Sequence, residues 1–362
     1  MTRSPRHRRI VPTPWRAARW ALIGLTAAGA ALGAGCAGGA GGADRLAYAD
    51  PVARSAMRER AIAMLVDATA SPDAMARANA IEGLQPAPGR VVPLAIAALN
   101  DPNLGVRFVA AMTLGELRAQ EATEALRPLL RDASPMVQAA AIFAMTRVGA
   151  SVDPTPLGTM LRSSDPRVRS NAAFVLGKIG NASAVPMLRA VADEPAPLGV
   201  RAEDKLFRLQ VAEALVRLGR TDAIHAVRAA LYPSEQDGVE AAVLAAQIIG
   251  QLEDRRSVAV LVTRINDRVS AGREYLMPAE MRLAASLALA RMGYRDGAYV
   301  ADEHAESPDP VLRSQAAFVY GETVRVNELW KLERMLSDPE EMVRVSAAAS
   351  ALRAMERLDT GN

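Results

Sequence analysis

One short segment recurs along the chain at a fixed interval, and this period constrains the fold more than any other feature of the sequence. The segment has a position that is usually arginine, and it is occupied by Arg107, Gln138 and Arg169, and again by Arg313 and Arg344. Neighbouring copies are 31 residues apart. Self-similarity at a period of about 20–50 residues is typical of solenoids, in which each unit packs against its neighbours. We therefore expect one continuous repeat array rather than separate globular domains.

Each repeat unit has the apolar spacing of helices. In the segment 165–180, Val168, Ala172, Val175 and Ile179 fall on one helical face. Asp-Pro pairs precede such segments, where Asp caps a helix start and Pro suits its first position, and Gly180 supplies the stop. Shorter helical segments such as ASAVPMLRAVA lie between them. The sequence predicts an all-α fold, an α-solenoid of roughly nine helical hairpins stacked into a superhelix.

The segment DPRVRSNAAFVLGKIG at 165–180 resembles the short HEAT-like repeat of the phycobilisome-lyase type, whose pattern is D-P-x-V-R-x-x-A-A-x-x-L-G-x-I-G. The resemblance covers about residues 51–358 and implies a HEAT-repeat α-solenoid. It also implies an enzymatic alternative, because repeats of this type occur in proteins that attach bilin chromophores to phycobiliproteins.

The recurrent arginines have a structural interpretation and a functional one. We favour a ladder in which each guanidinium bonds turn carboxylates or helix-end carbonyls of adjacent units, because the residue recurs in phase with the core and a turn Asp precedes it. The alternative is a stripe that binds anions. The residues assigned to the ladder are Arg107, Arg169, Arg208, Arg282, Arg313, Arg344, Asp101, Asp165, Asp309 and Asp338.

The period is broken twice, by extra residues within 194–205 and 268–280. Insertions at one turn of a solenoid emerge on one edge, which is often a binding edge. We therefore expect Leu198, Arg201, Arg273 and Tyr275 to contact a protein partner, with a tolerated surface loop as the alternative.

A second candidate surface is the helix position that holds Met112, Phe143, Phe174 and Phe318. It lies off the main apolar stripe, and charged residues such as Lys178 follow four residues later. Aromatic and charged residues on one face suit the concave surface of a solenoid that binds a partner. Packing of these aromatic rings between helix layers is the alternative interpretation.

The N-terminal residues have the pattern of an export signal. Residues 1–19 hold six arginines, and an uncharged stretch runs from Trp20 toward Cys36. This resembles a bacterial lipoprotein signal, which implies lipidation at Cys36. We assign residues 1–35 to a signal peptide, 36–50 to a Gly/Ala-rich tether and 359–362 to a C-terminal tail, and we expect a membrane-anchored envelope protein. An uncleaved anchor and simple secretion are the alternatives.

Charge and motifs exclude several function classes. Six of the 43 lysines and arginines lie in residues 1–35, so 37 face 40 acidic residues in the remainder, which is not the basic body of a nucleic-acid binder. His225 and His304 lack metal-site spacing, and no catalytic motif is present. We expect a non-enzymatic scaffold that binds protein partners, with no cofactor, small-molecule substrate or nucleic acid. A bilin lyase-like or chaperone-like subunit and a DNA-binding HEAT protein are the alternatives.

Overall fold

The computed structural model describes residues 48–194, 202–232, 238–267 and 277–360. Throughout these ranges the regular structure is helical, with the eighteen α-helices α3 to α20, short 3-10 turns and no strand. The predicted all-α solenoid is therefore confirmed. None of the helices in the described ranges is long and apolar enough to cross a membrane.

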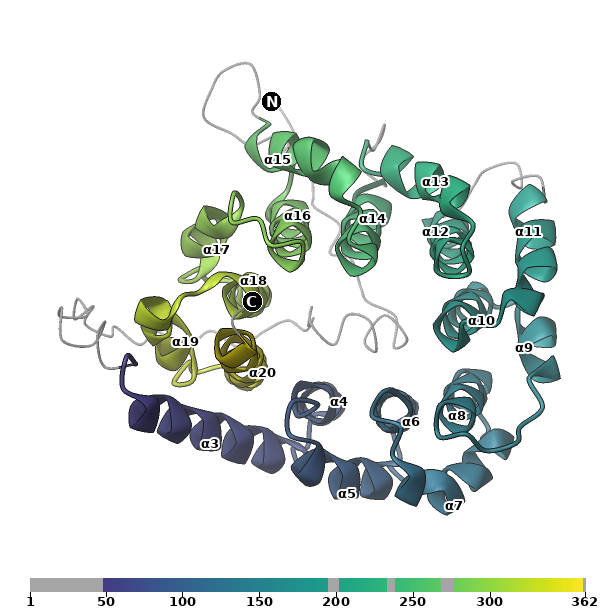
Figure 1. Ribbon diagram of the computed structural model, residues 1–362, viewed down its shortest axis with the longest axis horizontal. Coiled ribbons are helices and arrows are strands. Elements are labelled where there is room, and N and C mark those ends of the chain that lie inside the picture. The colour runs from purple at the N-terminus through teal and green to yellow at the C-terminus, as the bar shows by residue number, and fades with distance from the viewer. Residues whose placement is uncertain (1–47, 195–201, 233–237, 268–276, 361–362) are drawn as a thin grey trace, which may run out of the picture.

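The helices form nine hairpins, each an outer helix followed by an inner one (Figure 1). The outer helices are α3 (Pro51–Ala68), α5 (Pro88–Ala98), α7 (Thr123–Leu126), α9 (Thr155–Met160), α11 (Val185–Asp193), α13 (Ile224–Ala229), α15 (Val258–Asn266), α17 (Ala298–His304) and α19 (Trp330–Met335). The inner helices are α4 (Ala74–Gly83), α6 (Leu104–Glu116), α8 (Pro135–Arg147), α10 (Pro166–Ile179), α12 (Ala202–Arg217), α14 (Val239–Leu252), α16 (Ala279–Arg291), α18 (Pro310–Thr323) and α20 (Glu341–Thr360).

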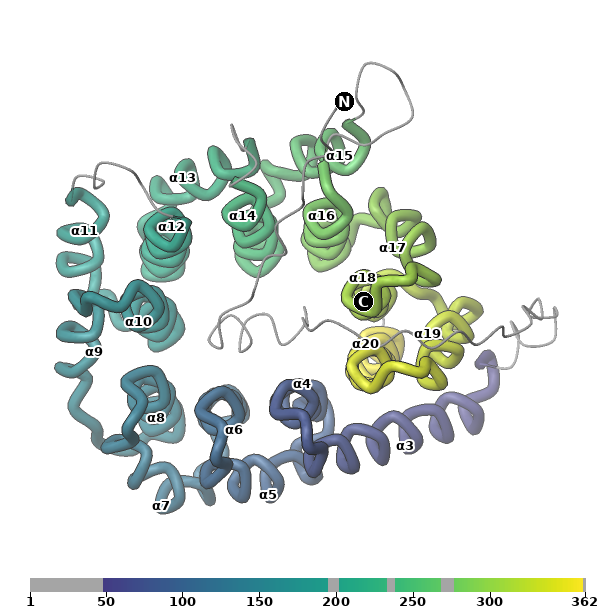
Figure 2. The backbone as a smooth tube through the Cα atoms, turned by 180° about the vertical axis from the view of Figure 1, so that it is seen from behind, coloured from purple at the N-terminus to yellow at the C-terminus, as the bar shows by residue number. Residues whose placement is uncertain are grey.

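The stack of hairpins closes on itself into a ring. Helix α20 packs against α3 and α4, so the last hairpin lies beside the first, as both views of the backbone show (Figures 1 and 2). Polar contacts also cross this closing seam: Arg58 of α3 pairs with Asp359 of α20, and the Oγ of Ser71, in the turn between α3 and α4, donates to Glu341 Oε2 at 3.0 Å. Helix α20 therefore includes residues 359 and 360, which the sequence placed in a tail.

Local sequence explains where the inner helices begin and end. At the start of α10, the Asp165 carboxylate accepts a hydrogen bond of 2.8 Å from the Arg167 amide, and Pro166 occupies the first turn. The helix ends at Gly180, whose φ of 79° lies in the left-handed region that glycine adopts without strain.

Small residues allow neighbouring inner helices to pack closely. A Cβ on Gly177 of α10 would lie 2.7 Å from the Ala214 Cα of α12, and one on Gly250 of α14 would lie 2.7 Å from the Ala288 Cα of α16. The buried apolar residues form one continuous cluster from Met57 to Met355. This continuity follows from the repeat, because a short hairpin buries its apolar face only against neighbouring hairpins.

Candidate functional site

The recurrent arginines join successive hairpins. Arg107 Nη1 donates to the Asp101 carbonyl of its own turn at 2.9 Å, while its Nε and Nη2 donate to the Asp132 carboxylate of the next turn at 2.8 and 2.9 Å. Arg77 binds Asp101 in this bidentate way, and Arg313 binds Asp338. These charge-assisted pairs fix the spacing between hairpins.

The other predicted ladder arginines use different acceptors. Arg169 Nη2 donates to Asp204 at 2.9 Å, and Arg282 Nη1 donates to Glu303 at 2.8 Å. Arg208 donates to the carbonyls of Ala192 and Glu194 at the C-terminal end of α11, and Arg344 donates to the carbonyls of its own turn. Each of these guanidinium groups therefore donates at least one hydrogen bond to its own hairpin or an adjacent one within the described residues, as the ladder interpretation expects.

Two predicted ladder carboxylates have another role. Asp165 and Asp309 accept hydrogen bonds of 2.8 Å from the amides two residues on, so they cap α10 and α18. The prediction that they bond ladder arginines is wrong, because they lie four residues before the arginine of their own unit. The carboxylates that reach the preceding unit's arginine, Asp101, Asp132 and Asp338, lie six residues before that position.

Partial burial and hydrogen bonding have opposite effects on the pKa values of the ladder carboxylates Asp101 and Asp132. Burial raises the pKa of Asp101, but the hydrogen bonds from Arg77 and from the Asn103 amide outweigh this effect and hold the pKa below its ordinary value. Burial likewise raises the pKa of Asp132, which the hydrogen bonds from Arg107 and the Ser134 amide lower further than burial raises it. Both carboxylates are therefore ionised at neutral pH and serve as structural ties between hairpins.

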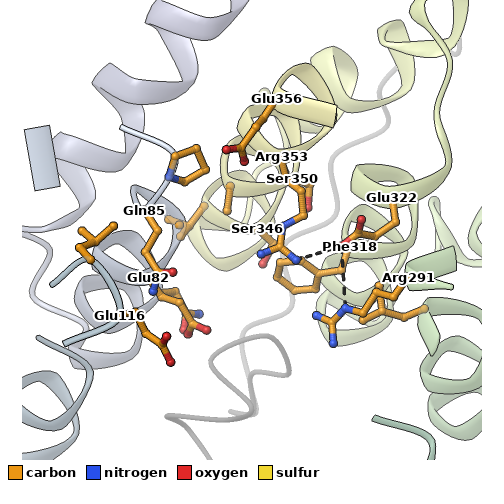
Figure 3. A pocket seen from close by; sticks show the side chains of 17 residues that line it. Glu82, Gln85, Glu116, Arg291, Phe318, Glu322, Ser346, Ser350, Arg353 and Glu356 are labelled. Carbon is orange, nitrogen blue, oxygen red and sulfur yellow. Dashed lines mark hydrogen bonds and ion pairs between the residues drawn. The ribbon is translucent and has the colours of Figure 1, made fainter. Parts of the chain in front are cut away.

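A cavity of about 380 Å³, called the central cavity below, is lined mainly by residues of the inner helices. It is bounded by α4 and α6 on one side and by α16, α18 and α20 on the other, so it adjoins the closing seam (Figure 3). The residues that line it are Asn79, Glu82, Gly83, Gln85, Pro86, Glu116, Leu117, Leu287, Arg291, Phe318, Glu322, Val345, Ser346, Ala349, Ser350, Arg353 and Glu356.

The cations around this cavity already have carboxylate neighbours. Glu322 Oε1 accepts a hydrogen bond of 2.9 Å from Arg353 Nη1 and lies 3.8 Å from Arg291 Nε (Figure 3). On the opposite side Glu116 pairs with Lys178 of α10 at 2.5 Å. The wall therefore carries both signs of charge, and Arg291 lies near a carboxylate without a hydrogen bond to it.

Several acceptors of the same wall have no partner among the described residues. Asn79 Oδ1 is a buried oxygen without a donor. The partly exposed Glu82 and the exposed Glu356 make no side-chain hydrogen bond or ion pair there. Asn79 is 8% exposed and Ser350, whose Oγ is also unpartnered, is 2% exposed. Both buried atoms cost stability, and they belong to a concave wall that also carries charged side chains, which makes this cavity the candidate binding site.

Burial has the largest effect on the pKa values of two groups in the cavity wall, Glu82 and Arg291. It raises the pKa of Glu82, and the nearby Arg353, Arg291 and Lys178 offset this only in part, while Glu116 adds to it. Burial also lowers the pKa of Arg291, as does Arg353, against the opposite effect of Glu322 and Glu82. Perturbed titratable groups in a concave site are a physical signature of function.

The structure separates the aromatic residues that were predicted to share a binding surface. Phe318 lines the central cavity, and Phe174 is partly buried against the core. Phe143 is 1% exposed and packs over Gly115, so its prediction as a partner contact is wrong. The phenyl group of Phe143 fills the space that the missing side chain of Gly115 leaves between α6 and α8.

The remaining predicted site residues lie outside the described ranges. These residues are Leu198, Arg201, Arg273, Tyr275 and the predicted lipidation site Cys36.

Sequence reasoning missed two residues of the cavity wall, Glu82 and Arg353, although the repeat register offered a signal. Glu82 occupies the register of Phe318, five residues after the recurrent arginine, and Arg353 occupies that of Lys178, nine residues after it.

Comparison with known proteins identifies the repeat. A family model described as HEAT repeats matches residues 62–146 and 124–203. Among curated proteins no sequence matches the chain. Similar solved structures include the complex of CpcE and CpcF of phycocyanin lyase from a Nostoc species, with 22% identity over 74% of this chain and 94% of that one and a TM-score of 0.37.

Two further solved structures are similar. Human deoxyhypusine hydroxylase in complex with glycerol is 16% identical over 85% of this chain and all of that chain (100%), with a TM-score of 0.35. An engineered protein is 17% identical over 88% of this chain and 93% of that one, with a TM-score of 0.31. The family-model match shows that the chain contains HEAT repeats, and the described hairpins continue the same two-helix pattern to residue 360.

Proposed function

We propose that the protein is a non-enzymatic scaffold of the bacterial cell envelope, a lipid-anchored ring of HEAT repeats that binds a protein partner through its central cavity. The observation that carries this proposal is the central cavity, whose wall holds glutamates and arginines together with the buried, unpartnered Asn79 Oδ1 and Ser350 Oγ. Binding energy at interfaces concentrates in a few such desolvated contacts.

The architecture supports binding by a preformed surface. Each hairpin is held on both sides, including the first and last, which pack on each other through α20 with α3 and α4. Arginine–carboxylate pairs such as Arg107–Asp132 tie successive turns. A preorganised frame reduces the entropy lost when a partner binds.

The proposal of a lipid anchor rests on the order of segments along the chain. The arginine-rich leader, Cys36 and the Gly/Ala-rich tether all precede α3, which begins at Pro51. Membrane fractionation of the wild type and the Cys36→Ala variant tests this part. We expect the wild type in the membrane fraction and the variant in the soluble fraction or in an unprocessed form. Unchanged membrane association of Cys36→Ala would point to an uncleaved anchor instead.

The partner is tested by affinity capture from detergent-solubilised envelope. Wild type is compared with the double variant Glu82→Gln, Arg353→Gln in the cavity and with Arg127→Gln, which removes an exposed ion pair to Glu124 on the outside of the ring. We expect one protein to be captured by the wild type and the outer variant and to be lost with the cavity variant. Capture that is equal for all three forms would contradict binding through the cavity.

The repeat motif at 165–180 favours a second candidate, a bilin lyase-like or chaperone-like subunit. Co-expression with a phycobiliprotein and a bilin source tests it, since chromophore attachment gives visible absorbance on the acceptor protein. A DNA-binding role is tested by salt-dependent retention on DNA, which the acidic balance of the chain after residue 35 disfavours.

A further inference from the structure

Glycine recurs at one position in every second inner helix from α6 onward. The position lies eight residues after the recurrent arginine position, and it holds Gly115 in α6, Gly177 in α10, Gly250 in α14 and Gly321 in α18. A Cβ on any of these glycines would lie 3.2 Å or less from a Cα of the inner helix that follows. On α8 the same position holds Thr146, which is exposed. Close backbone contact therefore occurs at alternate joints, where a joint is the contact between two successive inner helices.

These contacts join the inner helices in pairs, namely α6 with α8, α10 with α12, α14 with α16 and α18 with α20. In each pair the two helices pack more extensively on each other than either does on an inner helix outside the pair. Dense packing of this kind transmits displacement from one element to the next, so a pair moves as one body. The structural unit of the ring is therefore a double hairpin, twice the length of the sequence repeat.

The joints outside these pairs are held by side-chain contacts between adjacent hairpins, with one exception. Such contacts join Arg77 to Asp101, Arg217 to Gln251 and Arg282 to Glu303, in addition to the polar contacts of the closing seam. At the joint of α8 and α10, no side-chain hydrogen bond or ion pair joins the two adjacent hairpins within the described residues. This joint has neither the glycine contact nor a direct polar tie.

The sequence of the two turns explains why the tie is missing. Gln138 occupies the recurrent arginine position of α8, and its Nε2 donates to the Asp132 carbonyl of its own turn at 2.6 Å. Its amide provides no second group for the next turn. Ser163 lies six residues before Arg169, at the position where Asp132 accepts the guanidinium of Arg107 in the preceding turn. Both the donor and the acceptor of the tie are thus replaced.

One ion pair reaches across this joint from farther away. Lys178 of α10 pairs at 2.5 Å with Glu116 of α6, which belongs to the hairpin before that of α8. The two side chains are 26% and 30% exposed, so solvent and salt reach the pair. The pair connects the double hairpin of α6 and α8 with that of α10 and α12.

We propose that the ring bends at the joint of α8 and α10, and that the Lys178–Glu116 ion pair is a latch that limits this motion. The double hairpins on either side move as rigid bodies, because their own joints are closely packed. Glu116 also lines the central cavity, so bending at this joint moves part of the cavity wall. Hinge motions of this kind occur on the microsecond to millisecond scale.

Distances between spin labels in frozen solution test the proposal on the full chain carrying Cys36→Ala. Four exposed residues lie thirteen residues after the recurrent arginine position in successive hairpins: Gln120, Ser151, Ala182 and Thr221. Cysteine pairs at Gln120 and Ser151, at Ser151 and Ala182, and at Ala182 and Thr221 report three consecutive joints. We expect the widest distance distribution for Ser151 with Ala182, and narrow distributions for the other two pairs.

Two sets of substitutions change the same joint in opposite directions. Lys178→Gln, or high salt, is expected to broaden the Ser151–Ala182 distribution further and to leave the other two unchanged. The double substitution Gln138→Arg, Ser163→Asp supplies the tie found in the preceding turns and is expected to narrow it. Arg127→Gln, which breaks an ion pair on an exposed surface, is the matched control and should alter none of the three distributions.

Melting temperatures of the labelled variants show that each is folded before its distances are compared. Equal widths for the three label pairs in the wild type would overturn bending at the joint of α8 and α10. A Ser151–Ala182 distribution that stays the same in Lys178→Gln would overturn the latch. The measurement needs no partner, so its outcome is independent of the proposed scaffold function.

Discussion

Gly83 of the first inner helix packs directly on Ala349 of the last. A Cβ placed on Gly83 would lie 2.7 Å from the Ala349 Cβ, closer than side-chain carbons approach. The contact resembles those of Gly177 and Gly250 with alanines of their following helices. The closing seam therefore uses the same small-residue packing as the joints between hairpins that are consecutive in sequence.

Gly83→Val is expected to open or strain the closing seam. Overpacking of a tight joint costs about 1–3 kcal/mol of unfolding free energy. Denaturant unfolding measures this loss, and small-angle scattering measures an increase in the radius of gyration. Gly89→Val is the matched control, since nothing lies within 4 Å of its added Cβ. An equal effect of both substitutions would argue against a tight seam.

Arg107→Gln is expected to lower the unfolding free energy by about 1.5–3 kcal/mol, because it leaves the partly buried Asp132 carboxylate without its charged donor. Chemical denaturation of the variant checks this value. The control Arg127→Gln breaks a fully exposed pair with Glu124, which is screened by solvent and is expected to leave stability nearly unchanged. If Arg107→Gln were as mild as this control, the ladder would contribute no stability.

Glu82→Gln is expected to raise the melting temperature at neutral pH. Burial raises the pKa of Glu82 above its ordinary value of 4.5, so the folded state favours the protonated form and loses stability as pH rises through the folded pKa. Glutamine cannot ionise, so the gain over the wild type should vanish below the ordinary pKa. The charged groups that surround Glu82 are Glu116, Lys178, Arg291, Glu322, Arg353 and Glu356.

Calorimetric melting curves of both proteins between acidic and neutral pH measure this difference. Glu124→Gln serves as the control, because hydrogen bonding from Arg127 lowers the pKa of Glu124 instead. A Glu82→Gln variant that melts below the wild type at neutral pH would show that the carboxylate is needed by the fold.

Phe143→Ala is expected to cost about 3–5 kcal/mol of unfolding free energy, as for deletion of a buried ring. Its side chain is 1% exposed and fills the space over Gly115. Phe318→Ala, in the wall of the central cavity, is expected to cost less and to weaken partner capture instead. Thermal and chemical denaturation of both variants checks the order, and a larger loss for Phe318→Ala would contradict it.

The repeat pattern predicted the hairpins, but it assigned one role to two different aspartate positions in the turn. Asp101-Pro102 and Asp165-Pro166 look alike in sequence, yet Asp101 lies six residues before its arginine and Asp165 only four. The two-residue offset decides whether the carboxylate points to the neighbouring arginine or to its own helix amides. Asp132 was missed because the residues Ala-Ser separate it from the proline.

Ring closure could not be predicted from the repeat motif. It depends on the small rotation that each hairpin adds and on the contacts of α20 with α3 and α4, which lie far apart in sequence. The cavity was only partly predicted for the same reason. The register that holds Phe318 was recognised as an inner surface, but Glu82 meets Arg353 in space only when the two ends come together.

The distance between the two ends of the array tests the account most directly. Spin labels at Arg58→Cys and Asp359→Cys, in a Cys36→Ala background, replace two exposed side chains that pair across the seam. Double electron–electron resonance should give one narrow distribution at the short limit of the method. A long or broad distribution would show an open solenoid and contradict the closed ring.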